Sequence, residues 1–583
     1  MLLYTVIKDQ RDFGFSAAPD VDRLYCGTVS YLDCALPLEV LHRYLQGMVG
    51  SDPDGPQRQI TTRIACGLSQ DGLVARDKLI WRPALVPEDA ERKILEDRDL
   101  FARFCRLIEG RVIAEAEYPL FAQELNISAK LVPKLLQKAV NVSKGEWLPA
   151  LKRTSRTTWR CERCGGSEVK EWPAHFGTAA TCEGCKSLGA LSSLQVLFVG
   201  KSSASQAALS FSTISADSDT MNAEKNYTFS FSEAQRQAAA KLLEYNRLPF
   251  REILIWAACG AGKTEICFPL IKQYLQRGYK VLFAAPRQDV VHDVAPRLRR
   301  DFPEYRLKVL SGARPPDLDD SPLTVATTHQ ILRFRQAFDL IIFDEMDAYP
   351  FAHNRVLAYG LRQALKDGGK TVYLTATPTA EMFAKVAENS CALVRLPARH
   401  HGRPLPVPEI IKVRLPAPDV RPEAAKSKPC SEELSKVFRE LAERGPLLVF
   451  VPRINLVREW VSRLRALFPD KKVAGSWSAD KSRTQKVAAF LAGEIAVFVC
   501  TSILERGVTL DNVQVAVLYA DHELYDVRAL VQMAGRTGRT VQNPDGRALF
   551  LATRITKAMK EAVEWVREQN KLALEQGFLK EKE

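Results

Sequence analysis

Short apolar runs alternate with helical patterns along two long stretches of this chain. The first stretch, residues 227–400, contains "REILIW", "YKVLFAAP", "PLTVATT", "FDLIIFDE" and "KTVYLTAT". The second, residues 431–583, contains "PLLVFVP", "KKVAGSW", "IAVFVCTS", "VQVAVLYA" and "GRALFLAT", and it ends in a charged amphipathic helix from about residue 556. Apolar strands separated by helices are typical of parallel sheets. The pattern therefore predicts two tandem α/β domains.

The remaining segments differ from this pattern. Residues 1–150 mix polar and apolar stretches without a catalytic motif, which favours an accessory or docking domain. Residues 151–200 carry four cysteines, and residues 201–226 are rich in Ser, Ala and Asp, as in a linker. Residues 401–430 are rich in proline and predict a connector between the two α/β domains. Helical spacing in the first segment predicts an apolar face made of Leu95, Leu100, Phe101, Phe104 and Leu107.

Length and composition narrow the class of protein. A chain of 583 residues is too long for one core and predicts about three or four domains. The formal net charge of +13 favours a polyanionic partner, either nucleic acid or an anionic membrane surface. Neither a signal peptide nor an apolar run of about 18 residues is visible, and the 13 cysteines mostly stand singly, as reduced thiols do. A cytoplasmic protein is expected, with any attachment to the inner face of the cell membrane provided by partners.

One strand of the first domain leads into a phosphate-loop pattern, "ILIWAACGAGKTEI". Gly260 and Gly262 let the main chain curl so that its N–H groups face phosphate oxygens. Lys263 is expected to reach the β- and γ-phosphates, and Thr264 to hold Mg²⁺. Upstream, Gln235 of "FSEAQ" has a donor and an acceptor that suit the edge of adenine, although most helical glutamines are simply solvated. The pattern predicts an ATP site with Mg²⁺.

Another strand, "LIIFDEMDAYP", ends in three carboxylates that repel one another unless a cation or a donor shares them. Asp344 fits the carboxylate that holds Mg²⁺, and Glu345 fits the group that orients or deprotonates the attacking water. Asp347 completes the tetrad and is expected to couple the site to the next element. A solvated acidic turn is the alternative, but it leaves the apolar strand and the phosphate loop as coincidences.

The second domain contains "VQMAGRTGRT", in which Gln532, Arg536 and Arg539 stand among glycines. Arginines from a second domain stabilise charge on a transferring phosphoryl group when the two domains close. An RNA-like basic turn or ordinary surface salt bridges are the alternatives, which the glycine spacing disfavours. The sequence thus predicts ATP hydrolysis between two domains.

Two Cys-x-x-Cys pairs, in "RCERCGG" and "TCEGCKS", stand 17 residues apart. Four thiolates complete a tetrahedral zinc site with no open position, so a structural role is predicted. Disulfide pairing is the alternative, which a reducing compartment disfavours. His175, between the pairs, is interpreted as a surface residue, and the basic and aromatic neighbours suit either single-stranded nucleic acid or packing against another domain. The predicted zinc ligands are Cys161, Cys164, Cys182 and Cys185.

Ordered motifs along most of residues 227–555 resemble those of superfamily 2 helicases: "FSEAQ", "ACGAGKT", "AAPRQDVV", "TTHQ", "DEMD", "TAT", "LLVFVPR", "TSILERGVTL" and "QMAGRTGR". The resemblance implies two RecA-like domains with ATP between them and nucleic acid across both. Thr375 and Thr377 would then link hydrolysis to domain movement. Thr509 and Gln532 depart from the DEAD-box subset, which favours DNA translocation over RNA unwinding. The resemblance implies contacts with nucleic acid at Pro286, Arg287, Thr328, His329, Arg453, Thr501 and Ser502.

A closer resemblance covers roughly residues 150–583 and includes "WRCERCG", "WAACGAGKTE", "FDEMDAYP", "RPLPVPE" and "QMAGRTGR". These stretches resemble the ComFA family, the late-competence DNA-uptake ATPases of naturally transformable Gram-positive bacteria. The resemblance implies ATP-driven pulling of single-stranded transforming DNA into the cytosol. It implies as partners a ComEC-like membrane channel, a ComFC-like protein and single-strand-handling proteins. The first 150 residues are longer than the family usually carries ahead of its zinc site.

Two other functions fit parts of the sequence. One is a replication-restart helicase resembling PriA, although that family places a larger cysteine cluster inside its helicase core. The other is an ATP-gated scaffold that binds DNA without moving. A homo-oligomer is compatible with these functions and with DNA uptake. The overall expectation is an α/β chain with two tandem RecA-like parallel-sheet domains, preceded by a small zinc ribbon and an N-terminal mixed domain.

Overall fold

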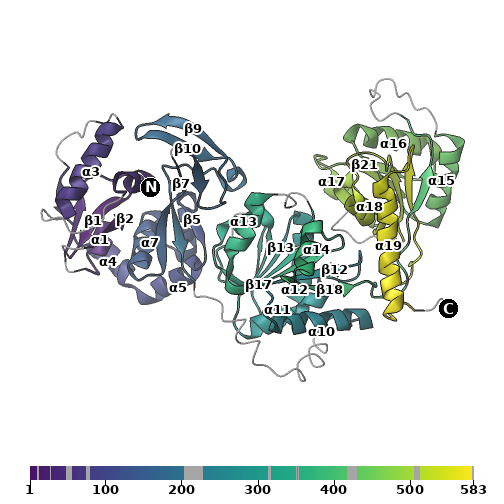
Figure 1. Cartoon of the computed structure of the whole chain (residues 1–583), viewed down its shortest axis with the longest axis horizontal. Helices are drawn as coiled ribbons and strands as arrows, with labels where there is room; N and C mark the ends of the chain where they lie inside the picture. Colours follow the sequence, from purple (N-terminus) through teal and green to yellow (C-terminus); the bar gives the residue numbers. More distant parts are fainter. Residues whose placement is uncertain are drawn as a thin grey trace.

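The structure is a computed structural model in which two parallel-sheet domains follow an N-terminal region (Figure 1). Residues 203–226 of the predicted linker, residues 417–429 of the predicted connector and Thr509 lie outside the described residues. The structure describes residues 1–9, 12–26, 28–46, 56–71, 73, 79–155, 157–202, 227–312, 317–348, 351, 354–416, 430–504 and 512–580.

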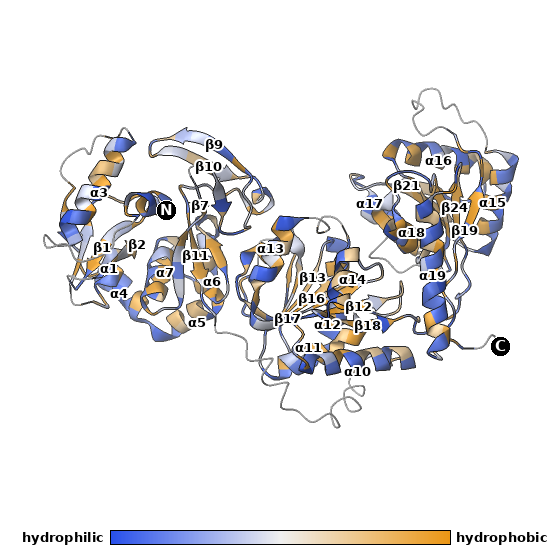
Figure 2. Cartoon of the chain, viewed as in Figure 1, coloured by the Kyte–Doolittle hydropathy of each residue, from blue (hydrophilic) through white to orange (hydrophobic). Residues whose placement is uncertain are grey.

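The first parallel sheet has the strand order β14-β15-β13-β16-β17-β12-β18. Successive residues of a strand point to opposite faces, and here both faces are buried. Ile253 and Ile255 of β12 belong to one apolar cluster, while Leu254 belongs to another. The strands are accordingly mostly orange in Figure 2, whereas the helices that cover them carry both colours. The elements are β12 (Glu252–Ala257), β13 (Val281–Ala285), β14 (Leu307–Leu310), β15 (Leu323–Thr327), β16 (Phe338–Asp344), β17 (Leu365–Thr375), β18 (Cys391–Leu396), α10 (Glu233–Arg247), α11 (Phe268–Gln276), α12 (Gln288–Asp301), α13 (Arg355–Ala364) and α14 (Ala380–Ala387).

The second parallel sheet has the strand order β19-β24-β23-β20-β22-β21. Its edge strand β19 comes from the predicted connector and pairs in parallel with β24. Two tandem parallel sheets with helices between their strands confirm the predicted RecA-like fold class. The elements are β19 (Glu409–Lys412), β20 (Leu447–Phe450), β21 (Val473–Ser476), β22 (Val497–Cys500), β23 (Gln514–Leu518), β24 (Ala548–Ala552), α15 (Glu432–Arg444), α16 (Ile454–Leu467), α17 (Arg483–Leu491), α18 (Val527–Ala534) and α19 (Lys557–Glu575).

The N-terminal region combines small antiparallel sheets with short helices. One sheet has the order β2-β1-β3-β4 and another the order β5-β11-β6, while β7 pairs with β8 and β9 with β10. Strand β11 follows the cysteine pairs in sequence but lies between two strands that precede them, so the cysteine-bearing segment is tied at both ends to one sheet. The elements are β1 (Tyr4–Lys8), β2 (Asp12–Ser16), β3 (Val29–Leu32), β4 (Trp81–Pro83), β5 (Val112–Ala114), β6 (Gly145–Pro149), β7 (Leu151–Arg153), β8 (Trp159–Cys161), β9 (Val169–Ala174), β10 (Gly177–Cys182), β11 (Val196–Gly200), α1 (Pro19–Asp22), α2 (Leu38–Tyr44), α3 (Pro56–Gln70), α4 (Asp89–Glu96), α5 (Arg98–Ile108), α6 (Tyr118–Leu125) and α7 (Val132–Asn141).

The N-terminal region is fastened to the first parallel-sheet domain. Nζ of Lys280 lies 3.1 Å from Oε2 of Glu109, and the main-chain N–H of Arg335 donates to the Gly110 carbonyl oxygen at 2.8 Å. Gly110 has a φ angle of +66°, and a Cβ atom there would stand 2.7 Å from the main chain of Ala337. Glycine at this position therefore permits a close approach of the two main chains.

The last helix, α19, belongs to the second domain but also contacts the first. Val566 and Ala573 lie in the apolar cluster that α10 and β12 build. The predicted helix from about residue 556 is confirmed, with Lys557 as its first residue. Across the described part of the chain, no helix has the length and apolar character needed to span a membrane.

Candidate functional site

The predicted nucleotide residues lie at the carboxyl ends of neighbouring strands in the first sheet. The phosphate loop follows β12, Asp344 ends β16, and Thr375 ends β17, which lies between the other two strands. Parallel α/β sheets bind ligands beyond the carboxyl ends of their strands. The strand order therefore brings motifs that are far apart in sequence to one edge of the sheet.

The phosphate loop has the main-chain geometry that its glycines allow. Gly260 and Gly262 have φ angles of +77° and +82°, in the left-handed region that favours glycine. A Cβ atom on Gly262 would stand 2.2 Å from Nε2 of Gln235. That nitrogen donates to the Ala261 carbonyl oxygen at 2.9 Å, while Oε1 of Gln235 accepts from the Ser232 N–H at 3.0 Å. Both ends of the Gln235 amide thus have protein partners, and its contact with adenine stays a prediction.

The carboxylates after β16 are buried beside the lysine of the phosphate loop. Nζ of Lys263 lies 2.6 Å from Oδ1 of Asp344. Burial raises the pKa of Asp344, the charge of Lys263 opposes this shift, and the charge of Glu345 adds to it. Glu345 has a φ angle of +56°, which is uncommon for a residue with a side chain, and its N–H donates to the Leu374 carbonyl oxygen at 2.9 Å. Carboxylate oxygens are ligands that suit Mg²⁺, and the cationic loop beside them suits phosphate.

Asp347 joins the acidic tetrad to the "TAT" motif that follows β17. Its Oδ1 accepts from Oγ1 of Thr375 at 2.8 Å, and its Oδ2 accepts from Oγ1 of Thr377 at 2.7 Å. All three side chains are buried, and hydrogen bonds to a buried carboxylate are among the stronger ones in proteins. The structure therefore brings together the residues predicted to couple hydrolysis to movement, while the coupling itself stays a prediction.

A cavity of about 440 Å³ lies between the two parallel-sheet domains, within the range of about 300–1,000 Å³ that is typical of small-molecule sites. The arginine motif lies beside the phosphate loop. A Cβ atom on Gly260 would stand 3.5 Å from Nε of Arg539. Arg536 is 3% exposed. Every residue predicted for nucleotide binding or hydrolysis lines this cavity, namely Gln235, Gly260, Gly262, Lys263, Thr264, Asp344, Glu345, Gln532, Arg536 and Arg539.

Sequence reasoning missed several residues that also line the cavity. Phe229 and Ser230 precede the "FSEAQ" motif, Arg297 comes from α12, and His400 comes from the segment after β18. The aromatic alternation in "YTFSF" was an available signal for Phe229. No local pattern marks Arg297, which lies 2.5 Å from Oε1 of Glu265, because this contact depends on how α12 packs beside the phosphate loop.

The residues predicted to face nucleic acid occupy equivalent places on the two sheets. In the first domain they follow β13 and β15, which are neighbours, and in the second they follow β20 and β22, which are also neighbours. Thr328 is 1% exposed, and burial lowers the pKa of His329. Their contact with nucleic acid stays a prediction. The residues are Pro286 and Arg287 after β13, Thr328 and His329 after β15, Arg453 after β20, and Thr501 and Ser502 after β22.

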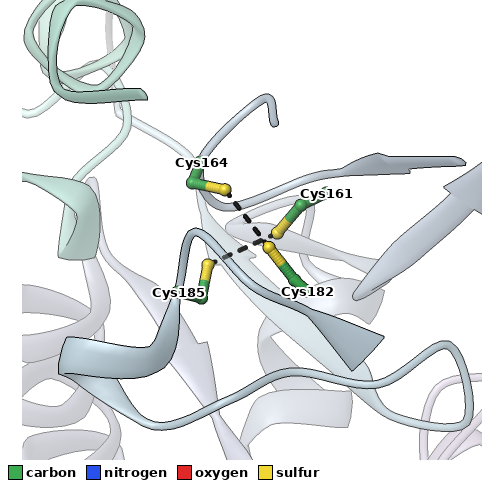
Figure 3. A group of neighbouring side chains, drawn as sticks. All are labelled: Cys161, Cys164, Cys182 and Cys185. Carbon is green, nitrogen blue, oxygen red and sulfur yellow. Dashed lines mark hydrogen bonds between the residues drawn. The ribbon is translucent and has the colours of Figure 1, made fainter. Parts of the chain in front are cut away.

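The two cysteine pairs converge on one buried point (Figure 3). The sulfur atoms of Cys161, Cys164, Cys182 and Cys185 all lie within 4.8 Å of one another. The sulfur atoms of Cys161 and Cys185 lie 3.5 Å apart, as do those of Cys164 and Cys182, which is far longer than the about 2.05 Å of a disulfide bond. His175 is exposed and stands outside this group. Four converging thiol groups fit a tetrahedral zinc ion, and zinc binding stays a prediction.

The cysteine group packs against the first parallel-sheet domain. It shares an apolar cluster with Leu332, which follows β15, and with Leu357 of α13. A Cβ atom on Gly165 would stand 2.7 Å from the ring of Tyr359, and the guanidinium of Arg160 lies 5.6 Å from the centre of that ring. Packing against a neighbouring domain, one of the two surroundings left open by the sequence, is therefore observed, while contact with single-stranded nucleic acid stays a prediction.

Comparison with known proteins supports the same reading of the chain. The family model described as "Type III restriction enzyme, res subunit" matches residues 228–380, and the "Helicase conserved C-terminal domain" matches residues 430–541. Competence protein ComFA of Bacillus subtilis is 32% identical over 427 residues, which cover 72% of this chain and 87% of that protein. Competence protein ComFA of Streptococcus pneumoniae is 32% identical over 428 residues, or 73% of this chain and 94% of that protein.

Among solved structures, S. cerevisiae Dbp5 bound to RNA and ADP BeF3 matches with a TM-score of 0.45 and 15% identity, over 62% of this chain and 93% of that one. The family assignment does not depend on this structural match. It follows from the two competence proteins, and the two family models match parts of both parallel-sheet domains. The chain therefore belongs to the ComFA family, as a DNA-dependent ATPase of helicase superfamily 2.

Proposed function

We propose that this protein is an ATP-driven translocase on single-stranded DNA that powers the import of transforming DNA into the cytosol during natural competence. One observation carries the proposal: Lys263 of the first domain and Arg536 and Arg539 of the second line a single cavity. Binding of a triphosphate there would draw the domains together, and loss of the γ-phosphate would release them. Each cycle would then shift one domain relative to the other.

Within the cavity, each residue has a distinct proposed role. Lys263 and the loop N–H groups bind the phosphates, and Glu345 orients or deprotonates the attacking water. Thr264 and Asp344 would hold Mg²⁺, which neutralises phosphate charge when bound. Arg536 and Arg539 stabilise the charge that develops on the transferring phosphoryl group, a contribution available only while the domains are closed. Gln532 lies beside these arginines, where its amide orients the motif toward the loop.

The proposed DNA track crosses both domains at the carboxyl ends of β13, β15, β20 and β22. Arg287 and Arg453 are the N-cap residues of α12 and α16, which follow two of these strands, so their side chains and the helix N-termini suit phosphate oxygens. Contacts of this kind carry little base specificity, and the affinity should fall steeply with salt.

We also propose that Cys161, Cys164, Cys182 and Cys185 hold one structural zinc ion. The ion would fix the two cysteine-bearing turns against α13 and the segment after β15, from which Thr328 and His329 come. In this proposal the protein works in the cytoplasm and reaches the membrane through partners. Those partners are a ComEC-like channel, a ComFC-like protein and single-strand-handling proteins.

The test of the proposed function compares ATP turnover by the full-length protein with single-stranded DNA, duplex DNA and RNA at one salt concentration. We expect single-stranded DNA to stimulate turnover most. A second assay places a biotin–streptavidin block on labelled single strands and measures its displacement with ATP, using Lys263→Ala as the inactive control.

Three outcomes of these assays separate the alternatives. Stimulation together with ATP-dependent displacement supports a motor. Stimulation by single-stranded DNA without displacement from either end of the strand would contradict translocation and favour an ATP-gated scaffold. Stimulation by RNA alone would overturn the DNA assignment.

A further inference from the structure

Arg399 lies deep between the two parallel-sheet domains. It follows β18, and at 2% exposed it is among the largest fully buried side chains. Its position in "RLPARHHG" belongs to none of the helicase motifs quoted above. Burying a guanidinium is costly unless hydrogen bonds satisfy its donors, so the partners of this side chain show what it does in the fold.

The partners of Arg399 within the described residues are main-chain oxygens from both domains. Its Nε donates to the carbonyl oxygen of Cys259, in the phosphate loop, at 2.9 Å. Its Nη1 donates to Thr537 at 2.7 Å and also to Gly538, and its Nη2 donates to Gly535 at 3.2 Å. One planar guanidinium thus joins the loop that faces phosphate to three carbonyls of the arginine motif.

Arg399 also shares an acceptor with a predicted catalytic arginine. The Gly535 carbonyl oxygen accepts from Nε of Arg539 at 2.9 Å as well as from Arg399. A Cβ atom on Gly260 would stand 3.5 Å from Nε of either arginine, so both guanidinium groups border the same face of the phosphate loop. Movement of Arg399 would therefore change the position of Arg539 relative to the loop.

The charges here are arranged at an energetic cost. Burial lowers the pKa of Arg399, and the neighbouring charge of Arg539 lowers it further. Arginine starts from a pKa above about 12, so the group stays charged near neutral pH. Two like charges beside a loop that already carries Lys263 favour the arrival of an anion such as the triphosphate.

We infer that Arg399 is a positioning residue of the ATPase site, which holds the arginine motif in register with the phosphate loop through its main-chain hydrogen bonds. Its fork of donors reaches both domains at once, which the single ammonium group of lysine does not reproduce. Arg399, which follows the edge strand β18 of the first domain, thereby sets where Arg536 and Arg539 stand when the two domains close. This inference deepens the proposed function, because it concerns closure of the same cavity.

The experiment uses Arg399→Lys in the full-length protein, with Arg414→Lys as the matched control, because Arg414 also lies between β18 and α15 and is exposed. We expect kcat for ATP turnover with single-stranded DNA to fall by about tenfold in Arg399→Lys, while KM for ATP changes by less than about threefold, because misplaced arginines affect the transition state more than ground-state binding. Arg414→Lys should match the wild type in both constants.

Two further measurements test the role of Arg399. Melting curves check that Arg399→Lys remains folded, and Arg399→Ala should lower kcat at least as much as the lysine variant. An unchanged kcat in folded Arg399→Lys would overturn the inference, as would a rise in KM that accounts for the whole loss of kcat/KM. The failure of wild-type protein to displace streptavidin would count against translocation alone, because the kinetic split is measured on ATP turnover.

Discussion

The indole N–H of Trp565 donates a hydrogen bond to the main-chain carbonyl oxygen of Ala376 at 3.2 Å, across 189 positions of sequence. Ala376 is the middle residue of the "TAT" motif in the first domain, and Trp565 lies on α19 of the second. The Trp565 ring also lies 5.2 Å, centre to centre, from the ring of Trp256 on β12, which leads into the phosphate loop. The last helix of the chain therefore contacts two motifs of the partner domain.

We predict that Trp565→Phe weakens the contact between the two domains. The change leaves the Ala376 carbonyl without its indole donor, at a cost of about 1–3 kcal/mol if no water replaces it. Melting curves should shift down, and stimulation of ATP turnover by single-stranded DNA should fall because the "TAT" motif loses its support. Trp172→Phe is the control, since Trp172 is exposed on β9. An equal effect of both changes would contradict this prediction.

Glu345→Gln should abolish most ATP turnover while ATP and DNA binding are retained. The amide keeps the shape of the side chain but loses the charge that would orient or deprotonate water, and removal of such a group typically costs about 10²–10⁴-fold in rate. Stopped-time assays of phosphate release and fluorescence anisotropy of labelled single strands measure the two properties. Normal turnover in the variant would show that Glu345 is wrongly assigned.

The cysteine group should bind about one zinc ion per chain in purified protein, measured by elemental analysis. Cys164→Ser should lose the ion and lower the melting temperature, because the turn that carries Gly165 then no longer packs closely against the ring of Tyr359. Cys66→Ser is the matched control, since Cys66 is exposed and outside the group. Stably folded wild-type protein without zinc would refute the assignment.

We predict that the stability of the protein depends on pH through Lys308. The pKa of its side chain is lowered from 10.5 to about 7. Burial is the largest cause, the charges of Arg111 and Lys280 add to the shift, and those of Asp320 and Asp317 oppose it. Between these two pKa values the unfolded chain binds more protons than the folded one, so stability rises with pH in that window. Lys308→Met should therefore raise the melting temperature at pH 7, and the gap from wild type should narrow by pH 9.

The assignment of the lowered pKa to Lys308 would be contradicted if the difference in melting temperature between Lys308→Met and wild type stayed constant or widened over this pH range. Lys308 donates to the Asp319 carbonyl oxygen at 2.9 Å, so the methionine variant loses one hydrogen bond. That loss is independent of pH and does not alter the expected narrowing. Lys412→Met, at an exposed position on β19, provides the control.

The nucleotide residues could be predicted from sequence because their geometry is set locally. Each stands directly after an apolar strand, and parallel strands end at one edge of the sheet whatever the detail of their packing. The five residues of the predicted apolar face, from Leu95 to Leu107, all pack into one apolar cluster, which confirms the face. Asp97 caps α5 through the N–H groups of Asp99 and Leu100, so the face is divided between two helices. Periodicity alone does not separate a continuous helix from two that share a face.

The contacts that hold the domains together could not be predicted in the same way. Arg399 donates to the Thr537 carbonyl oxygen across 138 positions of sequence. Its contacts are with main-chain oxygens, which every residue carries. Trp565 likewise bonds a carbonyl, which leaves no signature in the identity of Ala376. Side chains that recognise main chain at long range are invisible to motif reasoning, whereas side chains grouped by shared chemistry, such as the four cysteines, are visible.

The contacts between the N-terminal region and the first domain determine which domain a bound partner protein would hold in place. Lys280 pairs with Glu109, and Arg333 pairs with Glu117, beside the close main-chain approach at Gly110. A partner protein that binds the N-terminal region would therefore also hold the first domain in place. In such an assembly the first domain would stay fixed, and any ATP-driven movement between the domains would be made by the domain that carries Arg536 and Arg539.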